Sequence, residues 1–283
     1  MRRFRLYLLI LVLLGALAGF YYQSKQKVQT DTIQFQSKLL AKALPYHVVL
    51  PPGYGLITNS RKHYPVIYLL HGWNGHFDSW LNNTTLRQIA SSSQLIIITP
   101  EGNNGWYTDS ATTQTDKYET YIINELIPDV DSRYRTITDR RGRGIAGYSM
   151  GGYGAIKFGF KHPELFKLAA SISGAFDTPS RTDDQSIMEI FGESGSSVRS
   201  ENDIERLSRS VSPEKIAGLP YLYFDCGLSD PWLGANNHFA DVLSELKIPY
   251  EYRRLPGGHV WSYWDRQAQE VMSVATNVLS PPE

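Results

Sequence analysis

The segment 143–156 constrains the fold of this chain most, because it places a strand, a sharp turn and a helix directly after one another. Small and apolar residues before the turn predict the end of a buried strand, and residues 152–160 predict a helix. The turn reads Gly-x-Ser-x-Gly, with Ser149 at its centre. Such a serine adopts strained backbone angles, and the flanking Gly147 and Gly151 let strand and helix approach closely. The segment therefore predicts a nucleophile elbow, provided that a base, an acid and oxyanion donors lie elsewhere in the chain.

Buried strands alternate with helices along the rest of the chain. Continuous apolar runs at 64–70 and 94–100 predict central strands that are covered on both faces. Further strands are expected at 168–173, 219–224 and 250–254, and helices at 84–92, 118–134, 236–246 and 264–279. This alternation predicts an α/β fold with a mostly parallel central sheet and helices on both faces. Extended segments at 32–50 predict the antiparallel edge of the sheet.

The N-terminus has the pattern of an export signal. Arginines up to Arg5 precede an uncharged, apolar run at 6–22. Residues 1–22 are therefore predicted to be a signal peptide or an N-terminal membrane anchor, because residues 16–18 offer a cleavage site and the run also has the length of the shortest membrane spans. Everything after it is expected outside the cytoplasm, either secreted or anchored to the membrane.

Two parts are expected after this segment. Residues 23–32 form a polar linker, and residues 33–283 form a single catalytic domain. Within that domain, residues 177–218 are polar and rich in serine and arginine, which indicates a lid insertion.

The composition restricts the partners and cofactors of the chain. Lys+Arg and Asp+Glu each number 28, so no bulk positive charge indicates nucleic-acid binding. The single cysteine, Cys226, excludes an intramolecular disulfide and a cysteine-based metal cluster, and its setting predicts a buried thiol. No strand-borne phosphate-binding glycine motif occurs. We therefore expect a small-molecule or carbohydrate-linked substrate and no cofactor.

Two further residues complete a candidate catalytic triad. Asp230 follows the strand expected at 219–224, and His259 follows the strand expected at 250–254. Loops at the carboxyl ends of parallel strands meet at one edge of the sheet, and the order Ser, Asp, His is that of a hydrolase built on such a sheet. His259 would take the Ser149 proton, and Asp230 would orient the imidazole.

Other residues compete for these roles. His71 and His76 are the closest alternatives for the base, whereas four further histidines read as structural: His47, His63, His162 and His238. Asp225 is the alternative acid, but it should still lie on the strand, with less freedom to reach a histidine. A zinc site at His71, His76 and Asp78 is a further alternative, although it lacks a third firm ligand.

Two backbone N–H groups are expected to bind the oxyanion. One belongs to Met150, the residue after the nucleophile, and the other to Trp73, because Gly72 allows a tight turn before it. The six tryptophans all fall in or just beyond the loops that follow strands, where they either pack the loops or line a substrate cleft. The residues expected to contact substrate are His71, Gly72, Trp106, Tyr148 and Trp261, and Trp73 is expected to line the cleft with them.

Residues 33–280 resemble the esterase D-like branch of the α/β-hydrolases, which includes feruloyl esterases, S-formylglutathione hydrolases and, more distantly, mycolyltransferases. The matching segments are residues 68–72, 105–109, 147–155, 226–230 and 257–264. The resemblance implies an α/β-hydrolase fold, a triad of Ser149, Asp230 and His259, and hydrolysis of a carboxylic ester through an acyl-enzyme without a metal. Gly151 and Asp230 fit the hydrolytic branch better than the mycolyltransferases.

Three functions are compatible with these observations. The first is an exported serine carboxylesterase that acts on short-chain acyl or aromatic esters of the acetyl or feruloyl type. The second is a cell-envelope acyltransferase similar to the mycolyltransferases. The third is a catalytically silent hydrolase fold that serves as a binding module, against which the complete triad argues.

Overall fold

The structure is a computed structural model of the chain, and it describes residues 7, 10, 13–15, 19, 22–23 and 27–283. The predicted signal peptide or anchor, residues 1–22, lies for the most part outside the described residues. Among the residues that are described, no helix combines the length and the apolar content needed to cross a membrane.

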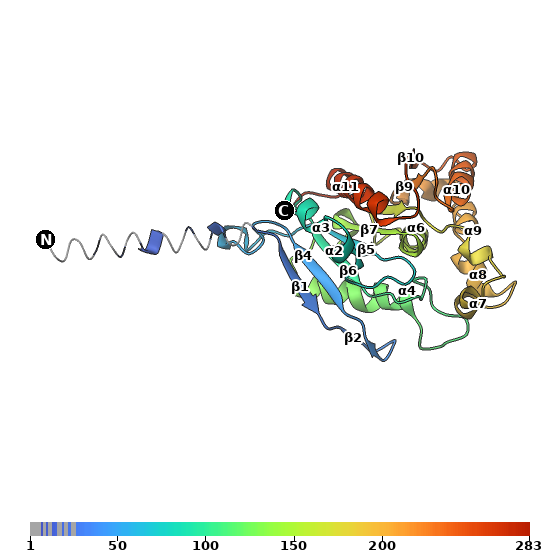
Figure 1. Ribbon diagram of the computed structural model, residues 1–283, viewed down its shortest axis with the longest axis horizontal. Coiled ribbons are helices and arrows are strands. Elements are labelled where there is room, and N and C mark those ends of the chain that lie inside the picture. The colour runs from blue at the N-terminus through green and yellow to red at the C-terminus, as the bar shows by residue number, and fades with distance from the viewer. Residues whose placement is uncertain (1–6, 8–9, 11–12, 16–18, 20–21, 24–26) are drawn as a thin grey trace.

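A central sheet of eight strands organises the molecule (Figure 1). Its spatial order is β1-β4-β6-β5-β7-β8-β9-β10. The first two strands pair antiparallel with their neighbours, and all the others run parallel, so the predicted mostly parallel sheet with an antiparallel edge is confirmed. The strands are β1 (Gln29–Ile33), β4 (Tyr46–Leu50), β5 (Val66–Leu70), β6 (Ile96–Pro100), β7 (Arg143–Tyr148), β8 (Leu168–Ile172), β9 (Tyr221–Gly227) and β10 (Glu251–Leu255). A separate hairpin joins β2 (Gln36–Ser37) to β3 (Lys42–Ala43).

The edge strand β1 corrects one predicted boundary. The residues 23–32 were expected to form a linker, but the strand begins at Gln29 and pairs with β4 along its whole length. Its exposed and half-buried side chains make the segment look like a polar connector, because only one side of an edge strand is covered. The sheet therefore starts inside the predicted linker.

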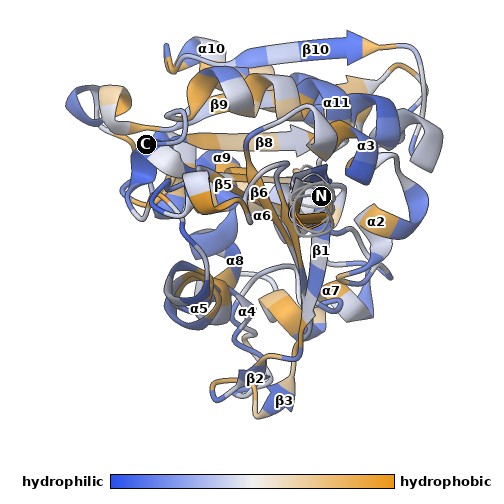
Figure 2. Cartoon of the chain, turned by 90° about the vertical axis from the view of Figure 1, so that its left-hand side faces the viewer, coloured by the Kyte–Doolittle hydropathy of each residue, from blue (hydrophilic) through white to orange (hydrophobic). Residues whose placement is uncertain are grey.

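Helices cover both faces of the sheet, as predicted. One apolar core lies between the sheet and the helices α4 to α6 and α10, and a second lies between the sheet and α2, α3 and α11. The central strands β5 and β6 are coloured as hydrophobic in Figure 2, whereas the edge strand β10 is mostly hydrophilic. The helices are α2 (Ser79–Asn83), α3 (Leu86–Ser91), α4 (Tyr118–Tyr121), α5 (Ile127–Arg133), α6 (Met150–Lys161), α10 (Leu233–Glu245) and α11 (Trp261–Val278).

One predicted helix differs in detail, and a short additional helix precedes another. The helix expected at 118–134 contains a π-helical turn, η2 (Ile122–Leu126), between α4 and α5. Pro128 follows this turn and has no N–H for an ordinary helical hydrogen bond, which accounts for the wider turn. The helix expected at 84–92 is α3, and the short helix α2 precedes it. The two are separated where Thr84 takes an extended conformation and Thr85 binds the Asp265 carboxylate through its N–H and hydroxyl.

The segment 177–218, predicted as a lid insertion, forms short helices between β8 and β9. They are α7 (Gln185–Phe191), α8 (Ser197–Asn202) and α9 (Ile204–Arg209). The buried Arg199 guanidinium ties the segment together, since it donates hydrogen bonds to the carbonyl oxygens of Gly192, Pro179 and Arg181. The insertion is thus a compact layer rather than a long loop.

Candidate active site

Ser149 lies on the sharp turn between β7 and α6. Its φ of 55° is in a region that side-chain-bearing residues rarely adopt. The flanking glycines are required by close backbone contacts: a Cβ added to Gly147 would lie 2.4 Å from Gly151, and one added to Gly151 would lie 2.4 Å from the Leu70 carbonyl oxygen. Strand β7, the turn and α6 therefore have the geometry of a nucleophile elbow.

A continuous chain of hydrogen bonds joins the serine to a histidine and an aspartate. His259 Nε2 lies 2.9 Å from Ser149 Oγ, and His259 Nδ1 lies 3.0 Å from Asp230 Oδ2. These three residues come from the loops after β7, β10 and β9, which meet at the carboxyl edge of the sheet. The arrangement allows the imidazole to accept the serine proton while the carboxylate holds its other N–H.

The environment of Asp230 keeps it ionised. Burial raises the pKa of this carboxyl, but hydrogen bonds from His259 and from the Trp232 N–H outweigh that effect and lower the pKa overall. The alternative acid, Asp225, lies on β9 as expected, and its carboxylate accepts a hydrogen bond from the Tyr263 hydroxyl at 2.8 Å. Asp230 is therefore the acid that contacts the histidine.

The two predicted oxyanion donors lie beside the serine. Met150 is the first residue of α6, where backbone N–H groups have no acceptor within the helix. A Cβ added to Gly72 would lie 3.2 Å from Ser149 Cβ, so the loop that carries Trp73 runs against the nucleophile. Within the part of the chain that the structure describes, no acceptor takes the N–H of Met150 or of Trp73. Both groups are thus free to bind an anionic oxygen.

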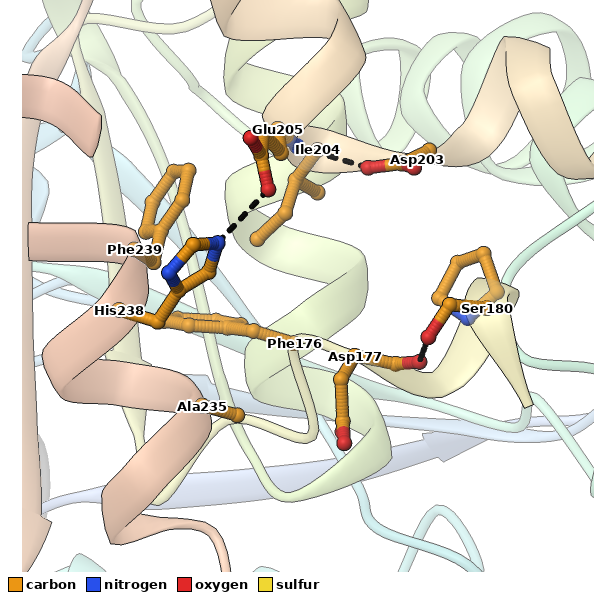
Figure 3. A pocket seen from close by; sticks show the side chains of 10 residues that line it. Phe176, Asp177, Ser180, Asp203, Ile204, Glu205, Ala235, His238 and Phe239 are labelled. Atoms are coloured by element: carbon orange, nitrogen blue, oxygen red, sulfur yellow. Dashed lines mark hydrogen bonds and ion pairs between the residues drawn. The ribbon is translucent and has the colours of Figure 1, made fainter.

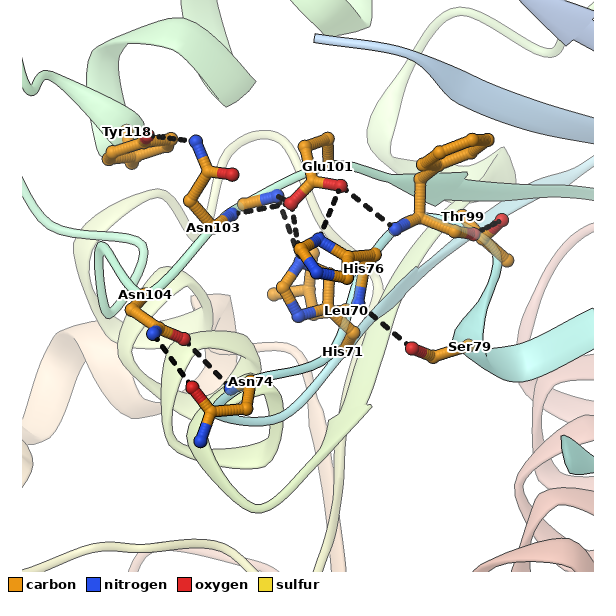
Figure 4. A network of polar contacts seen from close by, with 12 residues as sticks. Leu70, His71, Asn74, His76, Ser79, Thr99, Glu101, Asn103, Asn104 and Tyr118 are labelled. Carbon is orange, nitrogen blue, oxygen red and sulfur yellow. Dashed lines mark hydrogen bonds and ion pairs between the residues drawn. The ribbon is translucent and has the colours of Figure 1, made fainter. Parts of the chain in front are cut away.

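His71 and His76, the other candidates for the base, contact Glu101 instead of the serine (Figure 4). Both ring nitrogens of the buried His71 have partners, since Nδ1 lies 2.8 Å from the Gly72 carbonyl oxygen and Nε2 accepts the Gly102 N–H at 2.9 Å. In the described part of the chain, no cluster of three or more His, Cys, Asp or Glu side chains is arranged to hold a metal ion. Asp78, the third residue of the alternative zinc site, binds the Asn82 side chain.

A cleft of about 400 Å³ opens at the serine. Of the residues expected to contact substrate, Trp106 and Tyr148 line it, whereas His71, Gly72 and Trp261 do not. The Trp261 ring instead packs against Trp264, with 4.9 Å between the ring centroids. The residues lining the cleft are Trp73, Trp106, Tyr148, Ser149, Arg181, Asp184, Ser186, Ile187, Trp232, His259 and Trp264.

The cleft wall contains residues that the sequence analysis did not single out. Arg181, Asp184, Ser186 and Ile187 come from the insertion at 177–218, whose polar composition was the only signal of their role. Arg181 also lies over the Trp232 ring, 5.8 Å from its centroid, and thereby joins the insertion to the loop of the triad acid. This wall of the cleft forms where segments far apart in the chain pack together, so no local sequence pattern predicts which residues line it.

A buried lysine supports the loop that carries Trp106. Both Trp106 and Tyr107 have a positive φ of 51°. Lys157 on α6 donates hydrogen bonds to the Tyr107 carbonyl oxygen and to the Thr108 hydroxyl, and forms an ion pair with Glu119 at 3.0 Å. Burial lowers the pKa of Lys157 to about 8. These contacts hold the strained loop against the serine helix.

A second, smaller hollow of about 160 Å³ lies between the insertion and α10 (Figure 3). His238 Nε2 on α10 lies 2.8 Å from Glu205 Oε2 on α9, and both residues line this hollow together with Phe176. It shares no lining residue with the cleft at Ser149. His238 is therefore an interhelical contact, as the sequence predicted for a histidine within a helix.

Comparisons with known proteins show the family of this chain. The family model described as "Putative esterase" matches residues 37–271. An esterase of Mycobacterium tuberculosis is 27% identical over 283 residues, which cover 89% of this chain and 61% of that protein. This chain thus spans about three fifths of the length of that relative.

Two further relatives match over nearly their full length. An acetyl esterase of Caldicellulosiruptor saccharolyticus is 26% identical, with 83% of this chain and 93% of that protein covered. The solved structure of a ferulic acid esterase superposes with a TM-score of 0.78 at 28% identity and covers 89% of this chain and 100% of that one. The chain belongs to the Esterase family and has the α/β-hydrolase fold, as its resemblance to the esterase D-like branch predicted.

Proposed function

We propose that this chain is a serine carboxylesterase in which Ser149 is the nucleophile, His259 the general base and Asp230 the orienting acid. The observation that carries the proposal is the unbroken hydrogen-bond chain from Ser149 Oγ through His259 to Asp230. Ser149 and His259 line an open cleft. The Esterase family of the chain supports the same reaction.

The proposed reaction has two half-reactions. Ser149 Oγ attacks the ester carbonyl carbon while His259 Nε2 takes the hydroxyl proton, and the N–H groups of Met150 and Trp73 bind the oxyanion. The tetrahedral intermediate then breaks the bond to the alkoxy group, which leaves as an alcohol with the proton from His259. Water attacks the acyl-enzyme with His259 again as base, and the carboxylic acid and free Ser149 are released.

The substrates proposed are esters with a short acyl or an aromatic group. The relatives include an acetyl esterase and a ferulic acid esterase by name. Trp73 and Trp106 face the cleft with 5.7 Å between their ring centroids, and they offer apolar area to an aromatic ring. The Trp73→Ala variant keeps its backbone N–H but loses the indole, so kcat/KM for a feruloyl ester should fall more than for an acetyl ester.

Removal of the nucleophile or the base tests the proposal. The Ser149→Ala and His259→Ala variants should each lose at least about 10⁴-fold in kcat for p-nitrophenyl acetate. A fluorophosphonate probe should label the unsubstituted protein and fail to label Ser149→Ala. The matched control is Ser132→Ala, because Ser132 lies on α5 and its hydroxyl binds only the Asp129 carbonyl oxygen among the described contacts. Full activity in Ser149→Ala would refute the assignment.

The same assay separates hydrolysis from acyl transfer. Sugar and glycerol hydroxyls are added as acceptors, and the acid and the new ester are quantified. Free acid as the main product is the outcome that hydrolysis requires, whereas an excess of the new ester would identify an acyltransferase.

The location proposed for the enzyme is outside the cytoplasm. It is supported by the arginines and the apolar run within residues 1–22. Fractionation of cells that produce the full chain should recover the enzyme in the medium or with the membrane, and N-terminal sequencing separates the cleaved form from the anchored form. Recovery of the full chain from the cytoplasm would refute export.

A further inference from the structure

Two loops beside Ser149 are joined by one buried carboxylate. The loop after β5, residues 71–77, and the loop after β6, residues 101–107, lie side by side, with Glu101 between them (Figure 4). Glu101 is only 5% exposed. Its Oε1 accepts the Asn103 N–H at 2.7 Å, and its Oε2 accepts the Phe77 N–H at 3.2 Å. One side chain thus holds the backbones of both loops.

His71 carries this connection to the peptide unit next to the nucleophile. The Gly102 N–H is shared between His71 Nε2 at 2.9 Å and Glu101 Oε1 at 3.2 Å, and His71 Nε2 lies 3.3 Å from the same Glu101 oxygen. Because a carbonyl oxygen only accepts, His71 Nδ1 carries a proton and donates to the Gly72 carbonyl oxygen at 2.8 Å. The Gly75 N–H donates to the same oxygen at 3.0 Å. The Tyr107 hydroxyl donates to the His71 carbonyl oxygen at 3.0 Å.

The orientation of the Gly72 carbonyl sets the orientation of the Trp73 N–H. Both groups belong to one peptide unit, and in a trans peptide they point in opposite directions. Two hydrogen bonds fix the carbonyl on the side of His71 and Gly75, so the N–H is directed to the other side. The Gly72 backbone lies against Ser149 Cβ.

We propose that Glu101 is a positioning residue that, through His71, aims the Trp73 N–H at the oxyanion formed during acylation. This inference rests on the function proposed above. Burial raises the pKa of Glu101, but the neighbouring His71 ring and the N–H groups of Asn103 and Phe77 outweigh burial and lower the pKa overall, so the group is ionised at neutral pH. Only the carboxylate form accepts N–H groups on both oxygens.

The Glu101→Gln variant tests this role against a general structural one. Its amide nitrogen has no lone pair for an N–H, so one of the two loops loses its anchor. We expect kcat for p-nitrophenyl acetate to fall about 10-fold or more while KM changes less than about threefold, because loss of a whole oxyanion donor costs about 10²- to 10³-fold. Affinity for a trifluoromethyl ketone, which forms an oxyanion on Ser149, should fall by the same factor as kcat/KM.

Glu125→Gln is the matched control. The Glu125 carboxylate also accepts hydrogen bonds on both oxygens, from the Lys38 and Leu39 N–H groups on Oε1 and from the Ser37 hydroxyl on Oε2. These contacts lie at the β2–β3 hairpin and not in the cleft. This variant should lose thermal stability and keep kcat and the ketone affinity. A role of Glu101 in stability alone would make the two variants behave alike.

The outcomes are distinct. Unchanged kcat in Glu101→Gln, with Ser149→Ala inactive, would overturn this inference and leave the proposed function intact, whereas an active Ser149→Ala would overturn the proposed function. Should Glu101→Gln fail to fold, the pair His71→Asn and His71→Gln gives the same information. His71→Asn retains a donor near the Nδ1 position and should keep more kcat than His71→Gln; the reverse order would overturn the inference.

Discussion

At the scale of single residues, two aspartates on and after β9 have opposite environments. Asp230 accepts hydrogen bonds from His259 and from the Trp232 N–H. Asp225 is fully buried, its Oδ1 is bound by the Tyr263 hydroxyl, and its Oδ2 has no hydrogen-bond partner among the described residues. The two aspartates are only five positions apart in the sequence, so their different roles follow from the contacts that each makes in the structure.

The Asp230→Asn variant should lose about 10³- to 10⁴-fold in kcat, because an amide at this position favours the wrong imidazole tautomer. The measurement is kcat for p-nitrophenyl acetate at neutral pH. Asp225→Asn is the neighbouring isosteric change and should keep kcat within about threefold, since Asp225 has no contact with His259. Equal losses in both variants would contradict the assignment of the acid.

The stability of the protein should depend on pH through Asp225. Burial raises the pKa of this carboxyl from its ordinary value of 3.8 to about 7, so the folded state binds more protons than the unfolded state between these values. Its contribution to stability is therefore complete below about pH 4 and is lost as the pH rises to about 7.

The Asp225→Asn variant should not show this loss of stability with rising pH, because an amide does not ionise. The free energy of unfolding of the variant, relative to the unsubstituted protein, should rise by up to a few kcal/mol between pH 4.5 and pH 8, on the order of 1.4 kcal/mol per pKa unit. Urea denaturation at both pH values measures it. If the difference in free energy of unfolding between the variant and the unsubstituted protein is the same at both pH values, Asp225 is ionised in the folded state.

At the scale of elements, the turn between β7 and α6 depends on backbone contacts with β5. A Cβ at position 151 would lie 2.4 Å from the Leu70 carbonyl oxygen, and the backbone is unable to move away without shifting the sheet. Gly151→Ala should therefore lower the free energy of unfolding by about 3 kcal/mol or more and displace Ser149 from His259.

Gly234→Ala is the control for this change. Gly234 lies on α10, and a Cβ there would have no heavy atom within 4 Å. The free energy of unfolding of this variant should rise by about 0.5–1 kcal/mol, because alanine has a higher helix propensity than glycine. Denaturant unfolding and kcat are measured for both variants. A stable, active Gly151→Ala would show that the turn does not need its glycine.

At the scale of the whole molecule, β1 joins the N-terminal part of the chain to the sheet. A chain that starts at Lys27 keeps β1 and its pairing with β4, whereas one that starts at Phe35 lacks it. The shorter chain should lose about 5 °C in Tm, or roughly 2 kcal/mol, because β4 loses its outer partner. Equal Tm values would show that β1 adds nothing to stability. Both chains should keep the same kcat, because the residues that line the cleft follow other strands.

The sequence by itself determined the α/β fold, the order of its strands along the chain and the elbow at Ser149. These features follow from local patterns: continuous apolar runs, helical periodicity and glycines at a turn. It also indicated His259 and Asp230, because parallel strands bring the loops at their carboxyl ends together whatever the details of packing.

Only the tertiary structure decided which side chains meet within those loops. Glu101 looks like an ordinary loop residue in the sequence, yet it lies buried between two loops and binds the backbone of both. Trp261 is adjacent to the triad loop but packs against Trp264, while Arg181 reaches the cleft from a distant insertion. Such contacts join segments far apart in the chain, so they depend on how whole elements pack, which no short pattern encodes.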